Sequence, residues 1–260
     1  MCGFVSVILN HGAVDEALLV AMRDNLVHRG PDAAGLWVDG PVGFGQRRLS
    51  IIDLHAQSDQ PVVSDGGRFG LNFNGEIYNY QELRKDLQAR GYKFKSNSDT
   101  EVIVNLFDKY EIDSFTKLNG MFAFAIWDDD HQQLLLARDR MGIKPLYYAP
   151  VTGGVRFASN TQALLISDDI DTDIDPVGLH HQLTLHAVIP APHTILKGIR
   201  KLEPGHWMIV NPDGQIFKKR FWHLEATVPK TLNGQPAPQT EQEWTDVIHE
   251  SLKESVLKRL

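Results

Sequence analysis

The sequence contains a single cysteine, Cys2, which directly follows Met1 and directly precedes Gly3. Removal of Met1, which a small second residue permits, would leave Cys2 with a thiol and a free α-amine on one α-carbon. Near neutral pH, an α-amine with a pKa of about 7.7–8.0 can accept the proton of a thiol with a pKa of about 8.5. This is the chemistry of an N-terminal nucleophile. A lone cysteine is equally compatible with a simple packing role.

The tripeptide Asn74-Gly75-Glu76 could complete such a site. If the thiol attacks a carbonyl carbon, the oxygen that becomes negative needs hydrogen-bond donors, and a glycine N–H with a neighbouring side-chain amide supplies two. Each donor stabilises a transition state by on the order of 2.7–4 kcal/mol. The alternative is that Asn74 and Gly75 form the turn of a β-hairpin, for which Asn-Gly is a preferred pair.

Three charged residues could bind the two ends of an amino acid. Arg48 ends an apolar strand, where a guanidinium could hold a carboxylate through two parallel hydrogen bonds that a lysine cannot reproduce. Glu76 and Asp99 could bind an ammonium group. Arg48 could also be a solvated strand-end residue, and Asp99 could only stabilise a helix N-terminus. Together with the thiol, these charges describe an amino acid with a side-chain amide, which is glutamine.

Hydrophobic periodicity predicts the elements that carry these residues. Apolar residues recur at helical spacing over residues 13–27, and further helices are predicted at about 80–90 and 99–110. Ser98 and Glu101 have the spacing of a capping box. Strands are predicted at residues 2–9, 35–38, 42–49, 69–73, 121–127, 132–138, 146–149 and 154–158. This order indicates sheets that pack on each other and are covered by helices.

The later part of the chain carries weaker strand signals. These lie at Ile189–Leu196 and at the pair Trp207–Val210 and Gln215–Trp222. Residues 227–239 have the composition of a linker. A last helix begins with a capping box at Thr240–Glu243, and its apolar stripe needs a partner. We expect the chain to be a piece of a longer protein whose next domain covers this stripe, with an oligomer as the alternative.

The amino-acid composition limits which functions the chain can have. The 260 residues, 42% hydrophobic and 23% charged, are those of an ordinary soluble protein. A formal charge of −7 without a Lys/Arg stripe argues against nucleic-acid and membrane partners, and neither a signal peptide nor a membrane span is predicted. The single cysteine excludes an intrachain disulfide and a thiolate metal site and fits a reducing cytoplasm. The eleven histidines are scattered, so no metal site is expected.

Seven segments form an ordered series: Met1–Phe4, His28–Asp32, Arg48–Asp53, Phe73–Asn79, Ser98–Glu101, Leu118–Ala125 and Arg138–Tyr148. Together they resemble the glutaminase domain of class II glutamine amidotransferases, in the form found in glutamine-hydrolysing asparagine synthetases. The resemblance covers residues 2–160. Pro190–His206 is similar to the region where that domain approaches its synthetase partner, which favours asparagine synthetases over amidotransferases of sugar-phosphate and purine metabolism.

The resemblance implies an α+β fold, a four-layer αββα N-terminal-nucleophile hydrolase sandwich. It implies a glutaminase domain over residues 2–224, a linker over residues 225–239 and, over residues 240–260, the first helix of a truncated, helical synthetase domain. Cys2 would be the nucleophile, with Asn74 and Gly75 as the oxyanion hole. The glutamine-binding residues would be Arg48, Leu49, Ser50, Ile51, Ile52, Asn74, Gly75, Glu76 and Asp99.

The implied activity is hydrolysis of glutamine to glutamate and ammonia through a Cys2 thioester, with the ammonia used for ATP-dependent asparagine synthesis from aspartate. ATP and Mg²⁺ would bind only in the synthetase domain, because no Ser-Gly-Gly pyrophosphate-binding loop occurs in these 260 residues. No cofactor and no metal are therefore expected in this chain. Asn160 stands where relatives usually have a glutamate, outside the catalytic positions.

Two alternatives stay open. The same glutaminase could supply a different carboxylate acceptor, or the chain could be a catalytically silent binding or dimerisation module if Met1 is retained. The expected partners are glutamine, the synthetase domain of the intact protein and, as a further option, a second copy of the chain in a homodimer.

Overall fold

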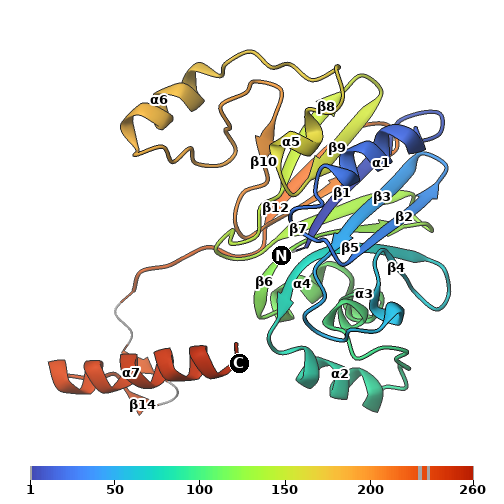
Figure 1. Cartoon of the computed structure of the whole chain (residues 1–260). Coiled ribbons are helices and arrows are strands. Elements are labelled where there is room, and N and C mark those ends of the chain that lie inside the picture. The colour runs from blue at the N-terminus through green and yellow to red at the C-terminus, as the bar shows by residue number, and fades with distance from the viewer. Residues whose placement is uncertain (1, 228–229, 233–234, 260) are drawn as a thin grey trace. The chain divides into compact units, whose positions relative to one another are not determined.

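The computed structural model describes residues 2–227, 230–232 and 235–259. The chain divides into two compact units, residues 1–222 and residues 223–260. The first unit contains two large β-sheets and the helices that cover them (Figure 1).

The first sheet has six antiparallel strands in the order β10-β8-β9-β1-β3-β2. Their bounds are Gly3–Leu9 (β1), Ala33–Asp39 (β2), Val42–Arg48 (β3), Tyr147–Val151 (β8), Gly154–Ala158 (β9) and Arg200–Lys201 (β10). β1 lies between β3 and β9 and is hydrogen-bonded to both. The residue before β1 is therefore held at the end of a central strand.

The second sheet also has six antiparallel strands, in the order β12-β11-β7-β6-β5-β4. Their bounds are Val62–Val63 (β4), Phe69–Ile77 (β5), Gly120–Asp128 (β6), Gln133–Arg138 (β7), His206–Val210 (β11) and Ile216–Arg220 (β12). β4 pairs only with residues 70 and 71 of β5. Beyond Leu71, the edge of β5 that faces away from β6 is open to contacts from loops.

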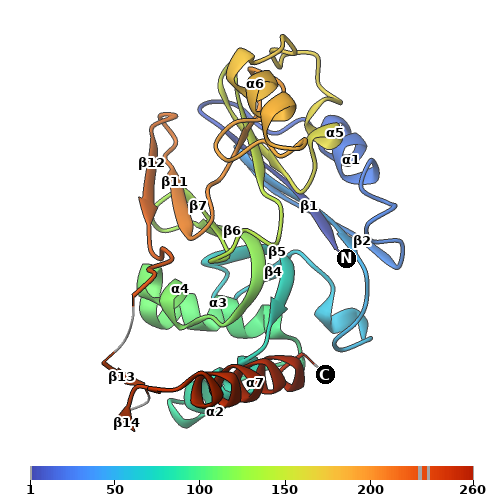
Figure 2. The ribbon, with the colours of Figure 1, turned by 90° about the vertical axis from the view of Figure 1, so that its left-hand side faces the viewer.

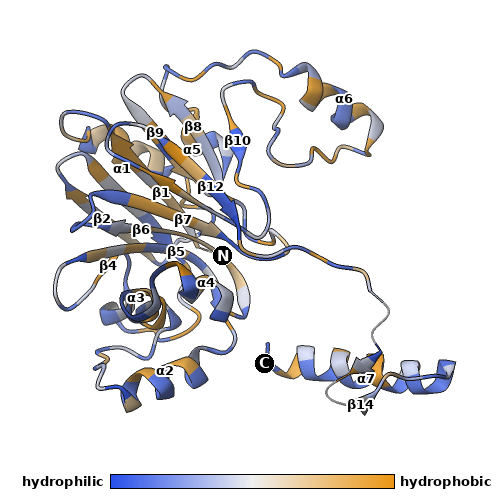
Figure 3. Cartoon of the chain, turned by 180° about the vertical axis from the view of Figure 1, so that it is seen from behind, coloured by the Kyte–Doolittle hydropathy of each residue, from blue (hydrophilic) through white to orange (hydrophobic). Residues whose placement is uncertain are grey.

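Alternating side chains pack the two sheets against each other. In β1, Phe4 and Ile8 join Trp127 and Leu136 of the second sheet in one buried cluster, whereas Val5 and other residues of β1 belong to a cluster on the opposite face. Both faces of the strand are buried, which explains why its sequence, apart from Ser6, is apolar rather than alternating. Apolar residues line the central strands (Figure 3).

Helices cover the two outer faces (Figure 2). α1 (Glu16–Asp24) and α5 (Thr161–Leu164) pack on the first sheet, and α3 (Asp99–Tyr110) and α4 (Ser114–Lys117) pack on the second together with α2 (Tyr80–Ala89). Short 3₁₀ turns lie at Ala56–Ser58 (η1) and Glu111–Asp113 (η2). The layers are helix, sheet, sheet and helix, which confirms the predicted αββα sandwich.

Two local predictions are wrong. Ser98 caps α3 as expected, but Glu101 does not complete the capping box, because its carboxylate accepts the N–H groups of Lys95 and Ser96 instead. Ile189–Leu196 does not form a strand apart from one bridge between Leu196 and Ile174. The helix α6 (Pro176–Thr184) was not predicted, because it has few buried residues to give its sequence a periodic pattern; it begins with an Asp175 cap.

The second unit contains a two-stranded pair, β13 (Thr231–Leu232) and β14 (Gln235–Pro236), and the helix α7 (Glu241–Leu257). The predicted capping box of Thr240 and Glu243 is confirmed. Parts of the predicted linker, residues 228–229 and 233–234, lie outside the described residues. Within the described residues, no helix is long and apolar enough to cross a membrane.

Candidate active site

Cys2 is held at the start of the central strand β1 by both its sulfur and its carbonyl. Its Sγ accepts the N–H of Leu49 at 3.4 Å and lies 3.6 Å from the Leu49 carbonyl, which follows β3. Its carbonyl accepts a hydrogen bond from Nε of Arg29 at 3.1 Å. The next residue, Gly3, packs against Arg29 so closely that a Cβ would lie 3.1 Å from Cδ of that side chain.

Burial raises the pKa of the Cys2 thiol, while the Leu49 N–H and the Arg48 charge oppose that rise. The thiol therefore does not ionise by itself near neutral pH, and a nucleophilic Cys2 needs a base to take its proton.

Asn74 and Gly75 lie inside β5 and not in a hairpin turn. They pair with Ala123 and Phe122 of β6. A side chain at position 75 is excluded, since a Cβ there would lie 2.3 Å from the Met121 carbonyl oxygen. The turn interpretation of this Asn-Gly pair is therefore wrong.

The N–H of Gly75 lies on the open edge of β5. Phe73 donates its N–H to Oε1 of Gln60 at 2.8 Å, and Ile77 donates its N–H to the Asp99 carboxylate at 3.0 Å. N–H groups two residues apart point to the same edge of a strand. The Gly75 N–H between them therefore faces the same side, away from β6.

The Asn74 side chain lies toward Cys2. On the same face of β5, Asn72 donates to the carbonyls of Val5 and Gly45, which pair with each other in the first sheet. Two residues further along β5, Asn74 lies toward the start of β1 and hence toward Cys2. Asn74 is 1% exposed, and its Nδ2 has no hydrogen-bond partner in the described part of the chain. A buried amide donor is thus available on the face of β5 that points toward the first sheet.

A small pocket joins residues from five separate segments of the chain. It is lined by Cys2, Arg48, Leu49, Ile51, Ile52, Gln60, Phe73, Gly75, Glu76, Ser98, Asp99 and Thr100. Two of the expected glutamine-binding residues are not among them. Asn74 lies behind the pocket, between the sheets, and Ser50 donates its N–H to the Asp32 carboxylate at 2.9 Å.

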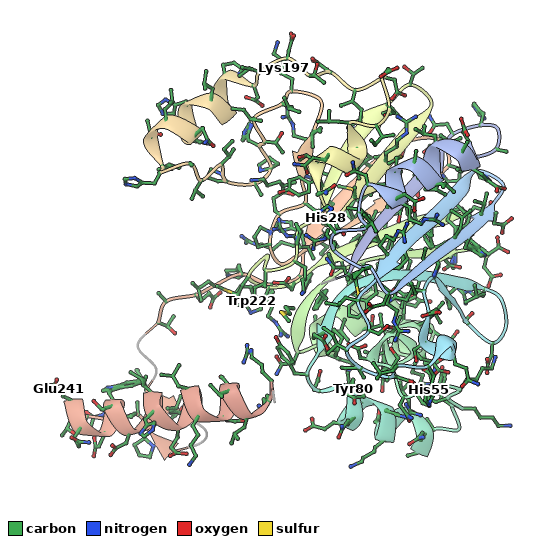
Figure 4. The ribbon with its side chains drawn as sticks, viewed as in Figure 1. His28, His55, Tyr80, Lys197, Trp222 and Glu241 are labelled. Atoms are coloured by element: carbon green, nitrogen blue, oxygen red, sulfur yellow. The ribbon has the colours of Figure 1, made fainter. Side chains whose placement is uncertain are left out.

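Arg48 is buried, and its guanidinium holds the loop that follows β3. Nη1 donates to Asp59 Oδ1 at 2.6 Å and to the His55 carbonyl at 3.4 Å, and Nη2 donates to the carbonyls of Ile52 and Asp53 at 3.2 and 2.5 Å. Figure 4 labels His55 in this loop. Both terminal nitrogens are therefore engaged within the protein. A ligand carboxylate would have to replace some of these acceptors.

Glu76 and Asp99 form a carboxylate pair in the pocket. Burial raises the pKa of Asp99 to about 6, although it accepts the Ile77 N–H. Burial and the nearby Asp99 raise the pKa of Glu76 to about 7, and Lys144 opposes this rise. Two carboxylates in a partly desolvated site repel each other unless a cation lies between them. The α-ammonium group of an amino acid is such a cation.

Within the described residues, no three His, Cys, Asp or Glu side chains gather in a way that could hold a metal ion.

Comparison with known proteins then decides the family. The glutamine amidotransferase domain family matches residues 1–222. The chain belongs to this family. The resemblance inferred from the seven sequence segments is confirmed.

The relatives of this glutamine amidotransferase domain are longer proteins. It is 39% identical to asparagine synthetase [glutamine-hydrolyzing] 1 of Bacillus subtilis over 98% of the chain and 39% of the relative. It is 38% identical to a putative asparagine synthetase [glutamine-hydrolyzing] of Mycobacterium tuberculosis over 95% of the chain and 39% of the relative. It is 34% identical to amidase chry2 of Gibberella zeae over 91% of the chain and 34% of the relative. The chain thus spans between about a third and two fifths of the length of these curated relatives.

A solved structure supports the fold. Glutamine phosphoribosylpyrophosphate amidotransferase of B. subtilis superposes with a TM-score of 0.64 at 20% identity, covering 85% of this chain and 49% of that one. At this level of identity the likeness concerns the fold alone.

Three residues that were not predicted from the sequence lie at or near the site of the amidotransferase domain. Arg29 anchors the Cys2 carbonyl, and Gln60 joins the Arg48 loop to β5. Lys144 is 3% exposed and interacts electrostatically with Glu76 and Cys2. Arg29 and Lys144 lie in segments that carry the family resemblance, which was the available signal, whereas nothing in the sequence singles out Gln60.

Proposed function

We propose that this chain hydrolyses glutamine to glutamate and ammonia, with Cys2 as the nucleophile, and that in the intact protein the ammonia serves ATP-dependent synthesis of asparagine from aspartate. The observation that carries the proposal is the meeting of the Cys2 thiol with the Glu76 and Asp99 carboxylates in one pocket. Sulfur and carboxylates match the reacting and the ammonium ends of one glutamine molecule.

The reaction follows from these positions. After removal of Met1, the α-amine of Cys2 takes the thiol proton, and the sulfur forms a bond to the side-chain amide carbon of glutamine. The Gly75 N–H and the Asn74 amide donate to the oxygen that becomes negative. The proton moves from the amine to the leaving nitrogen, the C–N bond breaks and ammonia departs. Water then adds to the thioester, releases glutamate and restores the thiol.

Glutamine is held at its charged end by the residues around the acid pair. Its α-ammonium neutralises Glu76 and Asp99, whose mutual repulsion it relieves. The carboxylate of glutamine binds the Arg48 guanidinium and replaces some of the loop oxygens that now accept hydrogen bonds from it. The backbone from Leu49 to Ile52, which includes Ser50, borders the side chain of glutamine. This exchange links glutamine binding to a rearrangement of the loop.

The test is the release of ammonia from glutamine by protein whose intact mass shows that Met1 is absent. Cys2→Ala is expected to lose at least about 10⁴-fold in rate, because no other group replaces the nucleophile. Its circular dichroism and melting temperature should stay at wild-type values. Ammonia release by Cys2→Ala at a wild-type rate would disprove the role of the thiol.

The names of the relatives support aspartate as the acceptor, because several of them are asparagine synthetases. A relative at 34% identity is named an amidase, and it supports the second candidate, a glutaminase that supplies another carboxylate. ATP and Mg²⁺ belong to the synthetase domain in this proposal, and the chain itself uses no cofactor. Adding aspartate, ATP and Mg²⁺ to the intact protein should give asparagine, and a product only with another acid would support the second candidate.

A cytoplasmic location is part of this proposal, because a single cysteine fits a reducing compartment. A retained Met1 would instead favour the silent binding or dimerisation module, because the nitrogen of Cys2 would then be part of a peptide bond and could not act as a base.

A further inference from the structure

The Asp59 carboxylate binds the same guanidinium to which the proposed function assigns the carboxylate of glutamine. Oδ1 of Asp59 accepts a hydrogen bond from Nη1 of Arg48 at 2.6 Å. The other acceptors of the two terminal nitrogens are the carbonyl oxygens of Ile52, Asp53 and His55, which are neutral. Asp59 is therefore the anion of this group of acceptors. The α-carboxylate of an amino acid carries the same charge on the same pair of oxygens.

The two partners of this ion pair differ in their access to water. The side chain of Arg48 is 6% exposed, whereas that of Asp59 is 42% exposed. A buried guanidinium without an anion is strongly destabilising, so Arg48 needs a negative partner whether or not a ligand is bound. A carboxylate that water already reaches loses little when it leaves an ion pair. Asp59 can therefore be exchanged for the carboxylate of a ligand, while Arg48 keeps an anion throughout.

The chain on both sides of Asp59 is anchored by contacts that do not involve the Asp59 side chain. Before it, the carboxylate of Asp53 accepts the N–H groups of Asn97 and His55 at 2.7 and 3.2 Å. After it, Oε1 of Gln60 accepts the N–H of Phe73 in β5 at 2.8 Å. The Asp59 side chain can therefore leave Arg48 while the rest of this segment keeps its place.

A second cavity lies beside Asp59. It has a volume of about 200 Å³, and Asp59, Ser64, Lys95 and Ser96 are among the residues that line it. Arg48 lines the glutamine pocket but not this cavity, so the ion pair of Arg48 and Asp59 lies between the two. A carboxylate that is displaced from Arg48 has space and polar surroundings in the second cavity.

We propose that Asp59 is a built-in competitor of glutamine, which pairs with Arg48 in the free protein and is displaced toward the second cavity by the α-carboxylate of the substrate. This inference rests on the proposed function in so far as glutamine binds through Arg48. Each glutamine molecule must break the ion pair of Arg48 and Asp59 before it can bind, so Asp59 lowers the affinity for glutamine. It does so without touching the amide that reacts.

The direct test is calorimetric titration of L-glutamine into the full chain with Cys2→Ala, which binds without turnover. Adding Asp59→Asn should tighten glutamine binding about ten-fold, because a neutral amide competes less well for the guanidinium than a carboxylate does. This factor is at the low end for a hydrogen bond between charged groups, since Asp59 is partly exposed. An unchanged affinity overturns the inference. A weaker affinity also overturns it and would show that Asp59 positions Arg48 for the substrate.

Two matched controls separate displacement from a general effect of charge. The α-amide of L-glutamine has no carboxylate to displace Asp59, so its affinity should differ by less than about three-fold between the two proteins, which also shows that the pocket of the variant is intact. Asp65→Asn removes one negative charge from another residue of the second cavity, whose carboxylate pairs with Nζ of Lys95 at 2.6 Å. It should leave glutamine affinity within about two-fold. A ten-fold gain in either control overturns the inference.

The kinetic consequence is a change in KM without a change in kcat. In protein that retains Cys2, Asp59→Asn should lower the KM for glutamine about ten-fold and keep kcat within about two-fold, because only binding of the charged end is affected. Hydrolysis with equal KM values in the two proteins would refute only the role of Asp59. The expected difference in glutamine affinity without any release of ammonia would refute only the proposed function.

Discussion

Glu76 is a residue whose environment opposes its own ionisation. Its pKa is raised to about 7 by burial and by Asp99, so the folded chain binds its proton more tightly than the unfolded chain does. Such a group lowers the stability of the fold as the pH rises through its folded pKa. The destabilisation is small at pH 4.5, where the carboxyl is protonated in the folded chain and about half protonated in the unfolded chain, and it is complete above about pH 8. Strain of this kind is typical of binding sites.

Glu76→Gln should therefore stabilise the protein at high pH while it weakens glutamine binding. We expect a gain in the free energy of unfolding of about 1–2 kcal/mol at pH 8, less than the full shift of the pKa because the side chain is only half-buried, and little gain at pH 4.5. Urea unfolding at both pH values measures the difference. The exposed Glu82 of α2 provides a control, since Glu82→Gln should have little effect at either pH. An equal gain for Glu76→Gln at both pH values would contradict this explanation.

At the scale of elements, the site depends on segments that are fixed by single buried side chains. Asp139, which is 1% exposed, accepts four backbone N–H groups from β6 and from the segment between β7 and β8. Arg48 holds the loop after β3 in a similar way, because its guanidinium donates hydrogen bonds to carbonyl oxygens of that loop. Apart from the short turn η1, these segments have no regular secondary structure, so the polar side chains replace hydrogen bonds that a sheet would supply.

Asp139→Ala should be strongly destabilising, because four N–H groups would lose their acceptor inside the protein. We expect a loss of about 3–5 kcal/mol in the free energy of unfolding. Asp139→Asn keeps one acceptor oxygen and should lose about half as much. Denaturant unfolding of the two variants against the wild type measures these losses, and a loss below about 1 kcal/mol in Asp139→Ala would show that the segment is held by other contacts.

At the scale of the whole molecule, the chain consists of two units with very different cores. Residues 1–222 contain the three buried clusters that hold the sandwich together, whereas α7 has no buried residue and exposes 55% of Ile248 and 62% of Leu252. An isolated helix of this length is marginal in water and gains stability mainly from packing on a partner. The cooperative stability of the chain therefore resides in the first unit.

Removal of residues 225–260 should leave the sandwich intact. The truncated chain, residues 2–224, is expected to melt within about 2 °C of the full chain, because no core cluster loses a member. Calorimetry of the two proteins compares the transitions, and their rates of ammonia release from glutamine test the site. A truncated chain that fails to fold would show that the second unit contributes to the core.

Local sequence patterns predict much of this arrangement. The apolar run of residues 2–9 predicts a buried strand, the spacing of Thr240 and Glu243 predicts the start of α7, and the position of Cys2 predicts a nucleophile. Periodicity and capping depend on neighbours within a few residues, so the sequence alone is sufficient for them. The ordered segments identified the family for the same reason, since each is a local pattern.

Only the tertiary structure decided what these residues face. Glu101 has the spacing of a capping residue but bonds to Lys95 and Ser96, and the Arg48 guanidinium holds its own loop. The raised pKa values of Glu76 and Asp99 and the nearby charge of Lys144 arise from β5, α3 and a β7–β8 segment that are distant in the chain. Desolvation and charge interactions depend on which groups fold over one another, and no local pattern contains that information.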